Sequence, residues 1–226
     1  MIRTIDQNDP EYPVELLDLE HPPERLWLKG PLNLNEATLR AVGVVGSRAC
    51  TAYGERAVDQ IVDGLAPSWT IVSGLAFGID AAAHRAAIGR DAPTIAVIAC
   101  GIDMVYPRAH QSLADHIVEE GLIVSEYEPG TDPSRGRFLG RNRIIAALSK
   151  GLVVVEASQR SGAMNTVGHA QYLGRPVMAV PGPITSMASD GPNMLLHLQT
   201  ARAVTDGHQV AHIINAHRDA TWKANA

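Results

Sequence analysis

The first residues along this sequence that could bind a ligand are Gly46-Ser47-Arg48, which follow the apolar run 41–45. Glycine allows a ligand to approach the backbone closely, serine offers a hydroxyl group, and arginine supplies a permanent cation. A helix expected just after the turn would add free N–H groups, so the turn predicts a site for a phosphate-bearing ligand. It matches neither the G-x-G-x-x-G nor the Walker pattern, which argues against a dinucleotide or a nucleoside triphosphate.

A second candidate is segment 135–143, which holds four arginines, one phenylalanine and no acidic residue. Arginines can follow a nucleic-acid backbone while an aromatic ring stacks on a base. The whole chain of 226 residues has a formal net charge of −5, which works against binding a polyanion. The segment is therefore either a local basic patch for single-stranded nucleic acid or the solvated start of a helix.

Two further loops carry polar residues after apolar runs. Ser73-Gly74 precede Asp80 and His84, which share a helix face at a spacing of i and i+4. The sequence places no nucleophile beside them. We therefore expect this pair to hold the loop by a hydrogen bond rather than to act as a catalytic dyad. Ser161-Gly162 predict a capped helix start that faces the same site.

A sheet must position these loops, because six short runs are apolar at consecutive positions, as in strands covered on both faces. The expected strands are 41–45, 69–73, 94–99, 122–125, 152–156 and 176–180. The expected helices are 53–65, 79–89, 111–120, 142–148, 166–173 and 194–198. The alternating order predicts an α/β fold with a doubly wound, mostly parallel sheet, whose strand C-termini share one ligand-binding edge.

Three parts of the chain differ in pattern. Residues 1–40 are punctuated by prolines and are expected to form an N-terminal extension packed on the core, with a short helix at 14–19 and an edge strand at 26–28. Residues 41–216 are expected to form one Rossmann-like domain, and 217–226 a disordered tail. No apolar run is long enough to span a membrane, and Cys50 and Cys100 have no metal-ligand spacing. We therefore expect a cytoplasmic protein with neither a membrane partner nor a metal.

Read together, these loops resemble the bacterial DNA-processing protein A family (DprA, also called Smf). The resemblance covers about residues 10–205 and depends on many motifs in the family's order. These motifs are Tyr12-Pro13, Val45-Gly46-Ser47-Arg48, Ser73-Gly74-Leu75-Ala76-Phe77-Gly78-Ile79-Asp80, Ala83-His84, Gly101-Ile102-Asp103, Tyr106-Pro107, Ser125-Glu126, Arg141-Asn142-Arg143-Ile144-Ile145-Ala146, Leu148-Ser149, Val155-Glu156, Ser161-Gly162, Gly174-Arg175, Ala179-Val180-Pro181-Gly182 and Gly191-Pro192-Asn193.

The resemblance implies an extended Rossmann-like (SLOG-type) domain that binds single-stranded DNA and is not an enzyme. It also implies protection of incoming DNA during natural transformation, loading of a RecA-type recombinase, and a homodimer, with no cofactor. The chain looks like a core-only form without the helical and winged-helix domains of many members. The family's DNA pocket maps onto Arg48, Arg135, Phe138, Arg141 and Arg143. The full set expected at the DNA or phosphate site is Gly46, Ser47, Arg48, Ser73, Gly74, Arg135, Arg137, Phe138, Arg141, Asn142, Arg143, Ser161 and Gly162.

Two other functions stay open at this point. One is a nucleotide-binding or nucleotide-hydrolysing protein of the same architecture, similar to the Lonely Guy phosphoribohydrolases. This sequence lacks their Pro-Gly-Gly-x-Gly-Thr-x-x-Glu loop, and Glu126 and Glu156 are its only strand-end carboxylates that could replace the acid. The other is an interaction module that binds no ligand.

Overall fold

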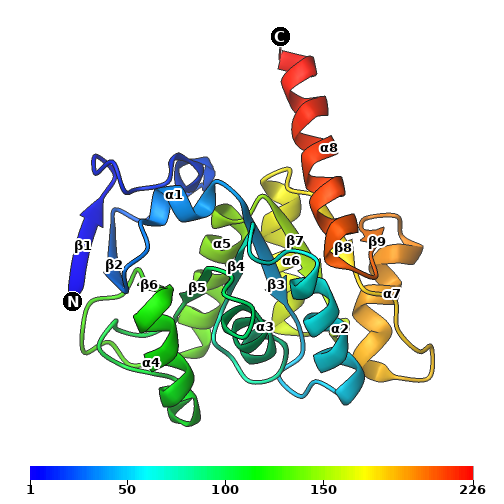
Figure 1. Ribbon diagram of the computed structural model, residues 1–226, viewed down its shortest axis with the longest axis horizontal. Helices are drawn as coiled ribbons and strands as arrows, with labels where there is room; N and C mark the ends of the chain where they lie inside the picture. The colour runs from blue at the N-terminus through cyan, green and yellow to red at the C-terminus, as the bar shows by residue number, and fades with distance from the viewer. Residues whose placement is uncertain (226) are drawn as a thin grey trace.

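The computed structural model describes the backbone of residues 1–225 and the side chains of residues 1–220. Its described residues form one nine-stranded sheet with helices on both faces (Figure 1). The strands are β1 Ile2–Asp6, β2 Arg25–Lys29, β3 Ala41–Val45, β4 Thr70–Ser73, β5 Thr94–Val97, β6 Leu122–Ser125, β7 Gly151–Val154, β8 Val177–Ala179 and β9 Arg202–Ala203. The helices are α1 Leu34–Thr38, α2 Ala52–Asp63, α3 Ile79–Ile88, α4 Gln111–Glu120, α5 Arg135–Leu148, α6 Gly162–Tyr172, α7 Asp190–His197 and α8 Gly207–Asn225, with 3₁₀ turns η1 Val14–Asp18, η2 Arg108–His110 and η3 Met187–Ser189.

The strand order is β1-β2-β6-β5-β4-β3-β7-β8-β9, and all neighbours from β6 to β9 are parallel. Every residue of β3 is buried, because Val42 and Val44 pack toward α2, α3 and α8 while Ala41 and Val45 pack toward α5 and α6. Burial on both faces explains the consecutive apolar residues of these strands. The prediction of a doubly wound, mostly parallel α/β fold is confirmed.

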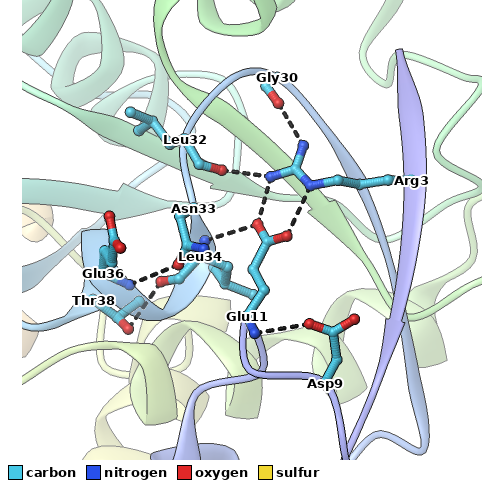
Figure 2. Close-up of polar contacts among 9 residues, drawn as sticks. All are labelled: Arg3, Asp9, Glu11, Gly30, Leu32, Asn33, Leu34, Glu36 and Thr38. Carbon is cyan, nitrogen blue, oxygen red and sulfur yellow. Dashed lines mark hydrogen bonds and ion pairs between the residues drawn. The ribbon is translucent and has the colours of Figure 1, made fainter.

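The N-terminal extension completes the sheet instead of lying on it. β2 pairs antiparallel with β6, and β1 pairs antiparallel with β2. Figure 2 shows the contacts that hold this segment: the Arg3 guanidinium donates to both carboxylate oxygens of Glu11, at 2.9 and 2.5 Å, and to the carbonyls of Gly30 and Leu32. Glu11 also accepts the N–H of Leu34 at 3.0 Å. One arginine thus joins β1, the following loop and the start of α1.

Two elements differ from the expectations. Helix α5 begins at Arg135, seven residues before the expected 142, and Ser134 accepts the Arg137 N–H at 3.4 Å. Gly136 and Gly140 weaken helix propensity and hid this start. The expected disordered tail from residue 217 is instead the continuation of α8 to Asn225, and residue 226 lies outside the described residues. Val210 and Ile214 anchor the first half of α8, and helix propagation then needs only its own backbone bonds.

Among the described residues, no helix is both long and apolar enough to span a membrane. α8 projects away from the body of the molecule at the red end of the ribbon (Figure 1).

Candidate nucleic-acid interface

The candidate site lies at the carboxyl edge of the parallel strands. β3 pairs with β4 on one side and with β7 on the other. The helices that follow β3 and β4 cover one face of the sheet, whereas α5 and α6 cover the opposite face. The chain therefore crosses from one face of the sheet to the other at this point, and the loops on the two sides are separated. Ligands usually bind at such a point in sheets of this kind. The sequence-predicted loops therefore do meet at one edge.

The Gly46-Ser47-Arg48 turn is held by the loops beside it. The Ser47 N–H donates to the Glu156 carbonyl at 2.6 Å, and the Ser47 carbonyl accepts the Ile79 N–H at 3.1 Å. The Ser47 hydroxyl accepts the Ala49 N–H at 3.1 Å, within its own turn. A Cβ on Gly46 would lie 2.6 Å from the Glu156 carbonyl oxygen. Packing inside the protein therefore requires a glycine at this position.

Arg48 is the part of the turn that faces solvent. Its guanidinium carbon lies 5.0 Å from the centre of the Phe138 ring, a cation–π distance. The Phe138 ring is also 5.6 Å from the ring of Tyr106, which belongs to the loop after β5. A cation and two aromatic rings from three separate segments therefore form one continuous surface.

The exposed start of α5 adds two more cations. Arg135 is exposed and Arg137 is partly exposed. Arg137 donates to the Asp132 carbonyl at 2.7 Å and lies over the Tyr127 ring at 5.7 Å. No acidic residue occurs in segment 135–143. The helix N-terminus and its arginines both favour an anion at this end of α5.

Arg141 lies inside the protein, although the sequence predicted it as a DNA contact. Only 3% of its surface is exposed, and its guanidinium donates to the carbonyls of Gly74, at 2.7 Å, and Val97. A Cβ on Gly74 would collide with that guanidinium. Asp80 is also buried nearby, and burial raises the pKa of its carboxyl while Arg141 acts in the opposite direction. Arg141 and Gly74 therefore shape the β4 loop and leave no surface for a phosphate.

Ser73 is also structural, because its buried hydroxyl donates to the Val44 carbonyl at 2.7 Å. The carboxylate of Asp80 accepts the N–H of Gly74 at 3.2 Å, as expected for a residue that holds this loop. His84 bonds through Nδ1 to the Thr94 hydroxyl at 2.7 Å, and burial lowers the pKa of His84 to about 3. The residues at 80 and 84 thus serve separate contacts and make no catalytic dyad.

Asn142 connects α5 to the start of α6. Its amide donates to the Gly162 carbonyl at 3.3 Å and to Asn165 at 3.1 Å. Gly162 itself is exposed, and a Cβ there would meet nothing within 4 Å. Ser161 holds the N-cap position but makes no capping bond, and its buried hydroxyl oxygen has no hydrogen-bond partner in the described structure. The expected side-chain cap is wrong, whereas the open helix start is present.

Arg143 is largely neutralised. It donates to Glu126 at 2.5 Å, and the side chains are 20% and 13% exposed, respectively. This pairing leaves Arg48, Arg135 and Arg137 as the predicted arginines with the greater access to a ligand.

The two carboxylates that could support a phosphoribohydrolase are both engaged. Glu126 pairs with Arg143, and Glu156, 1% exposed, accepts the N–H and the hydroxyl of Thr51 at 2.8 and 2.6 Å. Each carboxylate has a structural partner inside the protein. Among the described residues, no group of three or more His, Cys, Asp or Glu side chains could hold a metal ion.

Two aromatic residues at this edge were absent from the predicted site. Phe77, in the loop after β4, is 48% exposed, and Tyr106, in the loop after β5, is 47% exposed. Both stand in motifs that the sequence singled out, next to Gly78 and Pro107. For Phe77 the sequence held a signal, because phenylalanine is scarce: Phe77 and Phe138 are the only two in the chain.

The chain is similar to known proteins over most of its length. Residues 3–215 match the family described as DNA recombination-mediator protein A. A relative from Mycobacterium tuberculosis, named as a DNA processing protein DprA, is 51% identical over 177 residues, which are 78% of this chain and 46% of that protein. This chain therefore spans about half the length of that relative.

Two solved structures are similar over nearly the whole chain. The X-ray structure of DNA processing protein A from Streptococcus pneumoniae has a TM-score of 0.89 and 42% identity, over 93% of this chain and 74% of that one. A structure of the Helicobacter pylori protein, whose single-stranded DNA binding mode it describes, has a TM-score of 0.84 and 30% identity, over 96% of this chain and 95% of that one. The chain belongs to the DNA recombination-mediator protein A (DprA) family.

Proposed function

We propose that this protein binds single-stranded DNA at the surface formed by Arg48, Phe138 and the exposed start of α5. The observation that carries the proposal is the placement of the Arg48 guanidinium 5.0 Å over the Phe138 ring at the carboxyl edge of the sheet. Such a pair offers a cation to a phosphate and an aromatic face to a base. The similarity to the Helicobacter pylori protein described as binding single-stranded DNA supports the same function.

The distribution of charge supports a small number of phosphate contacts. Arg141 is buried and Arg143 is paired with Glu126, so neither is available as a free surface cation. Arg48, Arg135 and Arg137 remain on or near the surface. Each phosphate that they neutralise contributes about −0.7 to the slope of log affinity against log salt for a single strand. Three such contacts correspond to a slope of roughly −2.

The test is the affinity for a fluorescein-labelled oligothymidine, measured by anisotropy across a salt series. Arg48→Ala is expected to weaken binding and to reduce the magnitude of the slope by about 0.7. Arg40→Ala is the matched control, because Arg40 precedes β3 at the opposite edge of the sheet and is exposed to solvent, as Arg48 is. Wild-type binding that is absent or independent of salt would contradict the proposal.

We further propose that the bound strand is protected and passed to a RecA-type recombinase. The family description as a recombination mediator supports this step. Nuclease digestion of the complex and recombinase-driven strand exchange on strands already coated by a single-strand binding protein would test it. Unchanged digestion would contradict the protection of the strand. Strand exchange that is not stimulated would contradict its transfer to the recombinase.

We also propose a homodimer. Three exposed apolar side chains that flank α7 in the sequence support it: Ile184 and Met187 before the helix and Leu198 just after it. Burying them against a second copy would remove apolar surface from water. Light scattering across a concentration series tests the proposal, and a constant monomer mass at high concentration would contradict it.

A further inference from the structure

The side chain of Phe77 is an exposed aromatic ring on a firmly held loop. Almost half of it is open to solvent, at 48%. The Phe77 ring packs against the ring of His110 in a T-shaped contact, with centroids 4.8 Å apart and planes at 68°. His110 is buried, and its Nδ1–H donates to the Leu75 carbonyl at 2.9 Å. One side of the Phe77 ring is therefore supported while the rest faces water.

The loop that carries Phe77 is fixed on both sides of the ring. Leu75 has a φ of 57°, with its side chain fully buried. The Asp80 carboxylate accepts the N–H of Ala76 at 3.4 Å. Gly78 has a φ of +74° and packs so closely on the Ser47 and Arg48 carbonyls that no Cβ would fit. These constraints fix the backbone on both sides of Phe77, and with it the place from which the ring projects.

The position of Phe77 places it on the same rim as the proposed DNA site. Its neighbour Gly78 contacts the backbone of Arg48, whose side chain lies over Phe138. On its other side, Phe77 contacts His110 at the end of η2, the turn that follows Tyr106. Tyr106 in turn contacts Phe138 at 5.6 Å. These contacts thus connect Phe77 to Phe138 by two routes, one through Arg48 and the other through His110 and Tyr106.

We propose that Phe77 is a second base-stacking position, in addition to Phe138, and that it makes the site select unpaired bases. The proposal rests on single-stranded DNA binding at Arg48 and Phe138. Phosphates are present on both single and double strands, so the arginines alone discriminate little between them. A base offers its face to an aromatic ring only when it is out of the duplex stack. Two separated rings on one rim therefore favour a strand whose bases are free.

The test compares Phe77→Leu and Phe77→Tyr with the wild type on an oligothymidine and on a duplex of equal length. Phe77→Leu is expected to bind the single strand about 5- to 150-fold more weakly, the fold-change that corresponds to ~1–3 kcal/mol per stacked base. Its duplex affinity should be unchanged, and Phe77→Tyr should retain the wild-type preference. Tyr172→Leu is the control, since Tyr172 is 71% exposed at the far end of α6.

A second measurement changes the DNA as well as the protein. An abasic site is moved along the oligothymidine, and the wild type is expected to lose affinity at two separate positions. In Phe77→Leu only one of these positions should remain sensitive. Loss of affinity at a single position in the wild type, or equal single-strand affinity of Phe77→Leu and the wild type, would overturn the role of Phe77 while single-strand binding itself stands. Wild type that fails to bind any oligothymidine would overturn the proposed function and this inference together.

Discussion

At the scale of single residues, the arginines of this protein divide into two kinds that the sequence does not distinguish. Arg48 reaches solvent above an aromatic ring, whereas Arg141 is enclosed and donates to backbone carbonyls of two strand-end loops. Both belong to motifs of the family, and both look equally suited to a phosphate in the sequence. Only burial separates a ligand contact from a structural contact.

Arg141→Met is therefore expected to reduce stability first and DNA affinity only as a consequence. The substitution would leave the buried Asp80 without its nearby cation and would free the carbonyls of Gly74 and Val97. Each buried carbonyl left without its donor costs about 1–3 kcal/mol. Urea unfolding followed by circular dichroism would measure this loss. Arg48→Ala should leave the free energy of unfolding within about 0.5 kcal/mol of the wild type. A larger loss of stability in Arg48→Ala than in Arg141→Met would contradict the structural role of Arg141.

Glycines at the site also divide into two kinds. Gly46→Ala is expected to destabilise the protein by about 1–3 kcal/mol, because the new Cβ would lie 2.6 Å from the backbone oxygen of Glu156 and from Ile79. Gly162→Ala is the matched control, since nothing lies within 4 Å of its Cβ position and alanine suits a helix start better. Thermal melting of the two variants would compare them. Equal melting temperatures would show that the Gly46 contact relaxes without cost.

At the scale of elements, the sequence predicts well what repeats and poorly what depends on distant contacts. β3, β6 and α4 have the predicted bounds, because apolar runs and amphipathic spacing determine them locally. The early start of α5 was missed because Gly136 and Gly140 disfavour a helix that packing imposes. β1 was missed because the difference in burial between its successive side chains is small, and because it forms through pairing with β2. The exposure of Phe77 depends on His110, a contact that spacing along the chain does not reveal.

The N-terminal extension predicts a dependence of stability on pH. Burial opposes the ionisation of Glu11, but hydrogen bonds from Arg3 and the Leu34 N–H outweigh it and lower the pKa of Glu11 below its ordinary value of 4.5. A carboxyl with a lower pKa in the folded state binds fewer protons when folded, so its contribution is complete above 4.5 and is lost as the pH falls through the folded pKa. The Glu15 carboxyl, beside Lys150, has its pKa lowered in the same direction.

Glu11→Gln should therefore lower the free energy of unfolding near neutral pH by about 1–2 kcal/mol. The difference from the wild type should narrow as the pH falls below 4.5. Urea titrations at several pH values measure it, with the exposed Glu20→Gln of the same extension as control. A difference that is independent of pH would show that packing of the side chain, and not its charge, is what the extension loses.

At the scale of the whole molecule, an acidic protein is proposed to bind a polyanion. The formal net charge is −5, so the average field repels a nucleic acid. Exposed charges separated by more than about 8 Å are largely screened at physiological salt, however, which makes the local surface decisive. The exposed Asp132 precedes the α5 arginines in the sequence, whereas the exposed Glu119 lies in the last turn of α4, at the opposite edge of the sheet.

Neutralising each of these carboxylates raises the formal net charge equally, by one unit, but at different places. Asp132→Asn is expected to strengthen oligothymidine binding on the order of 2- to 5-fold at low salt, because it removes one repulsive charge beside the phosphates. Glu119→Gln should change the affinity much less, and the advantage of Asp132→Asn should disappear as salt shortens the screening length. Equal effects of the two variants would mean that net charge, not the arrangement at the carboxyl edge, controls binding, and the site would then have to be sought elsewhere on the surface.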